Sequence, residues 1–213
     1  MTWTATALST ANIDSTSDSL ATGLAELKTA VDRVSELSAH PTLACRTAMA
    51  LVAQSVVQVV STSSATWLSI PGSTAANRIP LDDTLPQISE GYSVISQAFT
   101  PKSASSTILI MVTGHALCTG TTIGDSATAA LFVDSSSSAL FAMRLSNAHT
   151  ANAAHTANLD FSHYVSSGTT AARTFSLRVG PNTSTGNVYI NGSNSARLYG
   201  GASLVRLTLI EFV

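Results

Sequence analysis

The stretch RTFSLRVGPNTSTGNVYING, residues 173–192, decides the fold class. Every second residue of 173–179 is apolar, which is the period of a β-strand that buries one face: Phe175, Leu177 and Val179. The turn residues Gly180-Pro181-Asn182 separate this run from a second apolar run at 187–190. The second run ends at Asn191-Gly192, and an Asn-Gly pair between two apolar runs is the strongest short signal for a hairpin. The stretch therefore predicts antiparallel β structure.

Short apolar runs separated by turn residues continue through residues 55–213. No alternation of strands with helices appears, so we do not expect a parallel α/β sheet. About eight to ten short strands with closely spaced turns predict a mainly β fold, a jelly-roll-like antiparallel sandwich. The last run, 203–212, is almost continuously apolar, which indicates a strand covered on both faces. We expect strands at 92–99, 106–117, 128–133, 138–145, 157–166, 173–179, 187–190, 196–199 and 203–212, with one or two more within 55–70.

Residues 1–54 differ from the rest, and we expect them to form an N-terminal α-helical attachment segment ahead of the sandwich domain, 55–213. Five apolar residues are spaced as in the seam of a coiled coil: Leu20, Leu24, Leu27, Val31 and Val34. A lone helix of this length is marginal in water, and Gly23 weakens it by about 1 kcal/mol. The helix therefore needs a partner. That partner is either its own domain or, as we favour, copies of itself in a short parallel bundle. A second short helix is expected at 42–53.

The chain carries few charges. Charged residues make up 10% of the 213 residues, against about 25% in an average soluble protein, while Ser and Thr together exceed a quarter. The net charge is −2 without a basic stripe, so nucleic acid is not an expected partner. We expect no membrane insertion and synthesis in a cytoplasm, because the sequence has neither a long apolar span nor a secretion signal. Such a surface is weakly soluble as a single chain, which indicates assembly into something larger.

Two adjacent carboxylates stand out in IPLDDTLPQISEG, residues 79–91. Successive side chains of an extended chain point to opposite faces, so this pair is poorly placed for acid/base catalysis. Asp followed by Thr between prolines is typical of a turn in which the carboxylate accepts backbone N–H groups. We therefore expect a structural turn rather than a cation site or a catalytic pair, formed by Pro80, Asp82, Asp83, Thr84 and Pro86.

Other chemical motifs are weak or absent. The sequence AHTAN occurs twice and places His149 and His155 six residues apart, on one face if the segment is a strand. These histidines could hold an ion on a trimer axis. We favour the alternative, that they are polar residues of a loop or of the surface. The sequence has no nucleophile elbow, HExxH motif or phosphate-binding loop, so we expect no catalytic, cofactor or metal residues. Cys45 and Cys118 lie far apart in the sequence, and we expect buried thiols.

A small group of aromatic and amide side chains falls near the predicted hairpin. Sugar-binding surfaces often combine tyrosine rings with Asn, although packing in the core or at an interface is the commoner role of such residues. The candidate receptor-facing residues are Tyr189, Asn191, Asn194 and Tyr199.

About three quarters of the chain resembles a module common in tailed bacteriophages and prophages, where such proteins are labelled tail fibre or minor virion protein. The resemblance implies a trimeric β-sandwich at the end of a virion appendage, preceded by a variable attachment region. The similar segments are VVQVVSTSSATW (56–67), IPLDDTLPQISEGYSVISQAFTPKSASSTILIMVTG (79–114), ALFVDSSSSALFA (130–142), FSHYVSSGTTAARTFSLRVGP (161–181), INGSNSARLYGG (190–201) and LTLIEF (207–212).

These observations predict a non-enzymatic virion structural protein. We expect a homotrimeric fibre or spike that attaches to other virion proteins and contacts the host surface, with host glycan as a candidate partner. The alternative is a capsid decoration protein that stabilises the shell. A depolymerase acting on polysaccharide is less favoured, because it needs paired acids in a groove.

Overall fold

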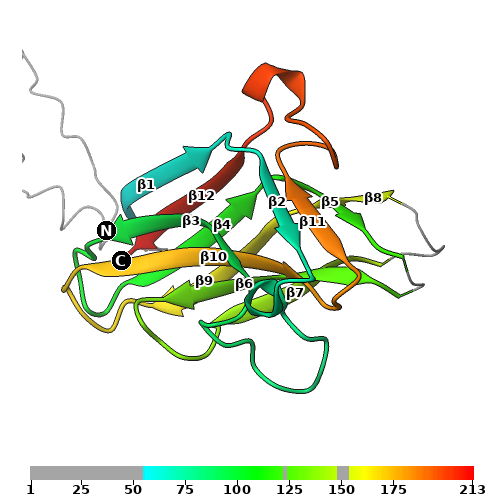
Figure 1. Cartoon of the computed structure of the whole chain (residues 1–213). Helices are drawn as coiled ribbons and strands as arrows, with labels where there is room; N and C mark the ends of the chain where they lie inside the picture. The colour runs from blue at the N-terminus through cyan, green and yellow to red at the C-terminus, as the bar shows by residue number, and fades with distance from the viewer. Residues whose placement is uncertain (1–54, 122–123, 148–153) are drawn as a thin grey trace, which may run out of the picture. The chain divides into compact units, whose positions relative to one another are not determined.

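The computed structural model describes residues 55–121, 124–147 and 154–213 (Figure 1). The predicted helices at 20–34 and 42–53, Cys45 and His149 lie outside these residues. Residues 54–213 form one compact unit. No helix in the described ranges has the length and apolar character needed to cross a membrane.

The described chain forms three four-stranded sheets, all of whose strand pairs are antiparallel. Sheet 1 contains, in spatial order, β1 (Val56–Ser64), β12 (Val205–Phe212), β4 (Thr107–Thr113) and β9 (Phe161–Ser166). Sheet 2 contains β2 (Leu68–Pro71), β11 (Asn187–Ile190), β5 (His115–Thr119) and β8 (Ala154–Asn158). Sheet 3 contains β3 (Tyr92–Phe99), β10 (Arg173–Pro181), β6 (Ser126–Val133) and β7 (Phe141–Asn147).

Sheets 1 and 2 are two halves of one bent layer. Strand β4 continues into β5 through the single residue Gly114, while β1 leads into β2 and β8 into β9 across short breaks. Gly114 is required at the bend because a Cβ there would lie 2.9 Å from Val205 Cγ2. Counted as long strands, the layers have orders 1-8-3-6 and 2-7-4-5 along the chain, which is the jelly roll. The predicted fold class is therefore confirmed.

One hydrophobic core lies between the bent layer and sheet 3. Its fully buried side chains alternate along the strands, as the period-two pattern of 173–179 predicts. Phe175 and Phe99 meet edge to face, with ring centroids 6.4 Å apart. The remaining large members include Ile108, Ile110, Leu131, Leu177, Leu207 and Leu209.

Several expected strands differ in the structure. The predicted strand 106–117 is divided at Gly114, and 157–166 is divided between β8 and β9. The predicted strand 196–199 is wrong: residues 191–204 form a loop with one isolated bridge, Gly192 to Arg197, and the short 3-10 helix η3 (Tyr199–Gly201). Asn191 has a φ of 59°, which turns the chain away from a continuing ladder.

Strand β6 is buried on both faces along its whole length. Its inner face joins the main core, and its outer face packs under Ile79 and Ile88 of the loop that contains the two aspartates. Arg178 on the neighbouring β10 donates from Nε to Glu90 O and from Nη2 to Gly91 O, both at 2.7 Å, and so fixes the end of that loop. The 79–91 loop therefore covers the outer face of sheet 3 and packs against it.

Candidate functional site

The two adjacent aspartates are exposed, and Asp82 shapes a turn. Asp82 Oδ1 accepts hydrogen bonds from Thr84 N at 2.9 Å and from Thr84 Oγ1 at 2.6 Å. The Thr84 hydroxyl, followed by its backbone N–H, lowers the pKa of Asp82, although slight burial opposes the shift. This is the geometry of a capped turn. Pro80 is exposed, and Pro86 O accepts from Ala139 N at 2.9 Å, so the turn is tied to the loop between β6 and β7.

A buried acid that sequence reasoning missed is Glu211, which is fully buried on β12. Its carboxylate accepts hydrogen bonds from Ser106 Oγ at 2.6 Å and Gln58 Nε2 at 2.7 Å. It also accepts from the backbone of Lys102 at 2.8 Å and of Ser103 at 3.1 Å. Burial alone would raise the pKa of Glu211, but these hydrogen bonds outweigh it and hold the pKa below its ordinary value. The signal was a lone acid inside the apolar run LTLIEF.

The outward side of sheet 1, which we call the apolar face, carries a row of apolar side chains in register across all four strands. Val59 pairs with Ile210, Ile210 with Leu109, and Leu109 with Tyr164. Val59 and Tyr164 are 57% and 59% exposed, and the two central residues are half-buried. Further apolar side chains flank this row on the same sheet: Val56, Val57, Met111 and Phe212.

The apolar face has almost no charge. The strands alternate inward and outward residues, and Arg206, at the end nearest sheet 2, is the one charged outward side chain of this sheet. The strand predicted at 203–212 to be covered on both faces is covered on one. Its inner residues lie in the core, and its outer residues Thr208, Ile210 and Phe212 are partly exposed in the single chain. Sheet 1 has apolar residues on both faces, but the single chain covers only its inner face.

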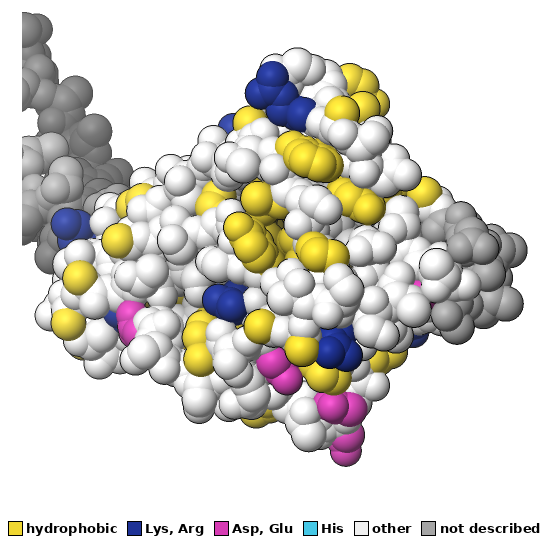
Figure 2. Space-filling model, in the orientation of Figure 1, with side chains coloured by type: hydrophobic (Ala, Val, Ile, Leu, Met, Phe, Trp, Pro, Cys, Tyr) yellow, Lys and Arg dark blue, Asp and Glu magenta, His cyan; other side chains and the backbone are white. Residues whose placement is uncertain are grey.

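The outward side of sheet 2, together with the loop 191–204, forms the pocket face. A second in-register row crosses it: Ser69 pairs with Tyr189, Tyr189 with Leu117, and Leu117 with Thr156. The loop projects beside this sheet, as Figure 1 shows at the top of the molecule. In Figure 2, hydrophobic side chains gather beneath this projection, over β2 and β11, while charged side chains are few and scattered.

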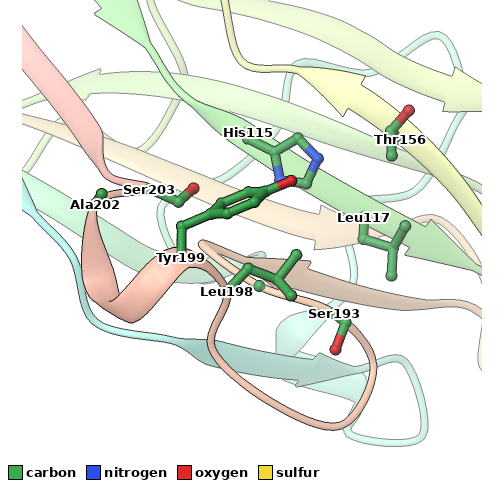
Figure 3. Close-up of a pocket in the computed structure, with 9 residues that line it drawn as sticks. His115, Leu117, Thr156, Ser193, Leu198, Tyr199, Ala202 and Ser203 are labelled. Atoms are coloured by element: carbon green, nitrogen blue, oxygen red, sulfur yellow. The ribbon is translucent and has the colours of Figure 1, made fainter.

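A pocket of about 440 Å³ lies between sheet 2 and this loop. In Figure 3 the Tyr199 ring extends toward His115, with Leu198 and Leu117 beside it. Tyr199 is 79% exposed, so its ring is open to solvent at the pocket mouth. The full lining is His115, Leu117, Thr156, Gly192, Ser193, Leu198, Tyr199, Ala202 and Ser203.

The backbone holds Tyr199 in a fixed and unusual conformation. Tyr199, Gly200 and Gly201 have φ values of 51°, 61° and 95°, a run that only glycine adopts freely. The turn is closed by Gly201 N donating to Leu198 O at 3.1 Å and by Ala202 N donating to Tyr199 O at 3.0 Å. The aromatic side chain is therefore presented by a structured loop.

A second pocket, of about 210 Å³, adjoins the same face. A buried acid, Asp125, positions its rim: Thr185 Oγ1 donates to Asp125 Oδ2 at 3.1 Å, and Gly120 packs so closely that a Cβ would lie 2.2 Å from this oxygen. The lining residues are Thr119, Gly120, Thr121, Ala154, Thr185, Asn187 and Asn194. Every polar side chain in this lining is an uncharged hydroxyl or amide.

The structure brings three of the four sequence-predicted receptor residues to the pocket face. Tyr199 lines the first pocket, Asn194 lines the second, and Tyr189 lies half-buried in the row between Ser69 and Leu117. Asn191 is only 1% exposed. Its Nδ2 donates to Ser64 O at 2.8 Å and Thr66 O at 3.0 Å, so this amide anchors the base of the loop.

The histidines are separated in the described part of the chain. His115 lines the first pocket, and His163 lies on β9 with its ring centroid 5.4 Å from that of Phe141. His155 lies on β8. Cys118 is buried on β5 at 5% exposure. Within the described residues no group of three or more His, Cys, Asp or Glu side chains has the arrangement of a metal site.

Comparisons with known proteins add little to this picture. No family model matches the chain, and no curated protein matches it. The structure of infectious bursal disease virus Gx strain aligns with 73% of this chain and 36% of that chain, at 16% identity and a TM-score of 0.31. The VP2 subviral particle of the same virus aligns with 75% and 38%, at 13% identity and a TM-score of 0.31. This chain thus spans little more than a third of either chain, and TM-scores of this size do not establish a common fold.

Proposed function

We propose that the chain is a non-enzymatic structural protein of a bacteriophage particle, a homotrimer that forms a fibre or spike. The apolar face of sheet 1 lies between copies, and the pocket face is presented outward to the host surface. The observation that carries this proposal is the in-register apolar row on a nearly uncharged sheet. Jelly rolls occur in viral capsid and lectin domains, which agrees with the proposal at the level of fold analogy alone.

A second copy of the same chain is the partner that best fits the apolar face. In a closed trimer each contact joins two different patches of the chain, and like residues approach one another only close to the axis. A charged face near the axis would repel its copies, and an uncharged one does not. The strands of this face carry Ser, Thr and apolar side chains, with Arg206 at one end. The segment 1–54 joins the sandwich at β1, the edge strand of the same sheet. A self-associating helix within this segment would hold several copies of the sandwich at a high local concentration.

The area of the apolar face supports a contribution from the N-terminal segment to the proposed trimer. Four strands about 4.8 Å apart and about seven residues long cover on the order of 450 Å². Stable interfaces bury roughly 800 Å² on each partner, so this face alone gives weak association. The heptad segment would supply the remaining contact.

The test is the molar mass of the full chain by light scattering during size exclusion. We expect three times 21.9 kDa for the unmodified protein. Val59→Lys places a charge on the exposed edge strand of the apolar face, where Lys is well tolerated in a folded monomer, and should shift the mass toward one chain. Ser96→Lys, at another exposed position on an edge strand, this one in sheet 3, should leave the trimer intact. A monomeric unmodified protein, or equal masses for both variants, would refute the proposed contact.

The position in the particle is tested separately. Particles that lack this protein should remain stable and lose adsorption to the host if it is a fibre. Rupture of the shell with normal adsorption would support capsid decoration instead.

A further inference from the structure

We infer that the pocket face binds a neutral oligosaccharide across its two adjacent pockets. This inference rests on the proposed function, because it assigns the chemistry by which the outward face would contact a host surface. It concerns the 440 Å³ pocket beside Tyr199 and the 210 Å³ pocket beside Asn194.

The first pocket offers an aromatic and aliphatic surface edged by hydroxyl groups. The ring of Tyr199 is exposed, and Leu117 and Leu198 extend the apolar surface beside it. Thr156, Ser193 and Ser203 supply hydroxyl groups at its edge, as the close-up in Figure 3 shows. A pyranose ring has the complementary pattern, with a face of C–H groups and a rim of hydroxyls. The volume of the first pocket lies within the roughly 300–1,000 Å³ typical of small-molecule sites. Such sites are mostly apolar and have a few polar groups that fix the orientation of the ligand.

Charge favours a neutral ligand. Among the described residues that line the two pockets there is no Lys, Arg, Asp or Glu, and His115 is the one titratable side chain besides Tyr199. A phosphate or carboxylate placed here would lose hydration without gaining a cation, which is costly. A cationic ligand would likewise find no carboxylate in the lining. Uncharged hydroxyl groups, in contrast, pair well with the hydroxyls and amides of Thr119, Thr185, Asn187 and Asn194.

The site is held in position before any ligand arrives, which lowers the entropic cost of binding. Trp67 Nε1 donates to Ser193 O at 3.0 Å, and the indole packs against Gly192 so closely that a Cβ would lie 2.3 Å from Trp67 Cδ1. Buried Asn191 ties the base of the same loop to the β1–β2 connection. Trp67 and Asn191 therefore hold in place the loop that forms one wall of the pocket.

The arrangement of the two pockets requires more than one sugar ring. Leu117 lines the first pocket and Thr119 the second, and both point outward from the same strand. Two residues along a strand span about 7 Å. A chain of two or more rings running along β5 would therefore reach both pockets, with one ring against Tyr199 and the next against Asn194.

The experiment uses the full-length protein and a panel of immobilised oligosaccharides. The panel contains neutral hexose, deoxyhexose and N-acetylhexosamine oligomers, with matched sialylated and phosphorylated members. We expect the unmodified protein to bind at least one neutral oligomer. Tyr199→Ala should weaken that binding at least about tenfold, and Tyr199→Phe, which keeps the ring, should retain most of it. Asn194→Ala should reduce binding of oligomers more than binding of the matching monosaccharide.

Tyr92→Ala is the matched control, because Tyr92 is an exposed tyrosine on sheet 3 and its loss should leave binding unchanged. No binding to any neutral member, binding to anionic members alone, or equal binding by Tyr199→Ala and the unmodified protein would overturn the inference. Molar mass is measured on the same samples. A trimer without sugar binding refutes the site alone, whereas a monomer that binds sugar refutes the trimer proposal alone.

Discussion

At the scale of single residues, the acid that matters most to the structure is Glu211 and not the conspicuous pair Asp82 and Asp83. Glu211 is buried and accepts hydrogen bonds from Gln58 of β1 and from Lys102 N and Ser106 Oγ of the 101–106 loop. The aspartates are exposed, and Asp82 shapes one turn. Sequence reasoning identifies the turn because its pattern is local. Glu211 cannot be recognised in this way, because Gln58 and Lys102 are distant from it in the chain.

Replacing Glu211 with Gln should destabilise the sandwich by about 1–3 kcal/mol at pH 7, since the amide NH₂ would face backbone donors. The folded-state pKa of Glu211 lies below its ordinary value of 4.5. Its stabilisation is therefore fully present above about pH 4.5 and is lost as the pH falls through the folded pKa. Urea unfolding at a series of pH values should show the difference between wild type and Glu211→Gln shrinking as the pH falls. Asp83→Asn, at an exposed acid, is the control and should change stability little. A constant difference at all pH values would contradict this assignment.

At the scale of elements, the strands follow the period-two pattern, but their ends do not. The predicted run 106–117 is one continuous alternation, and nothing in its apolar pattern marks the bend at Gly114. The bend arises from close packing against Val205, which is a tertiary contact. The failed strand 196–199 has the same origin, because Asn191 turns toward Ser64 and Thr66 instead of continuing the ladder. Local patterns therefore predict element type better than element limits.

The 79–91 loop should behave as part of the core. Ile79 is fully buried against Ala130 and Phe132 of β6, so Ile79→Ala should cost about 2–4 kcal/mol of unfolding free energy. Leu81→Ala removes a side chain from the same loop that is 53% exposed, and it should change stability by less than about 0.5 kcal/mol. Chemical denaturation of both variants measures the difference. Equal effects would show that the loop does not pack against sheet 3 as part of the core.

At the scale of the whole molecule, composition predicts assembly, and the apolar face is where we propose that copies of the chain meet. The scarcity of charge predicts a partner, but the strand pairing determines that Val59, Ile210, Leu109 and Tyr164 share one face. The pocket face was foreseen in part: three of the four aromatic and amide residues near the hairpin meet there. His115, Leu117 and Thr156 could not be foreseen, because β5, more than 70 residues before the loop, supplies the first two, and β8, more than 30 residues before it, supplies the third.

Removing residues 1–53 should leave a folded sandwich that associates more weakly. The compact unit 54–213 has its own core, so circular dichroism and thermal unfolding of the fragment should match a folded β protein. Its trimer should dissociate at concentrations where the full chain remains assembled, because the apolar face alone is small. Analytical ultracentrifugation over a dilution series measures this. Equal dissociation constants for fragment and full chain would show that the heptad segment contributes nothing to assembly.

The passage of β4 directly into β5 has a consequence for avidity. The segment formed by β4, Gly114 and β5 carries Leu109 on the apolar face and His115 on the pocket face, six residues and at most about 20 Å along. If the apolar faces meet around an axis, this segment sets three pockets at a fixed spacing without any flexible tether. Sugars displayed at that spacing on a cell surface would be held by three weak contacts at once, and dissociation would require all three to release together.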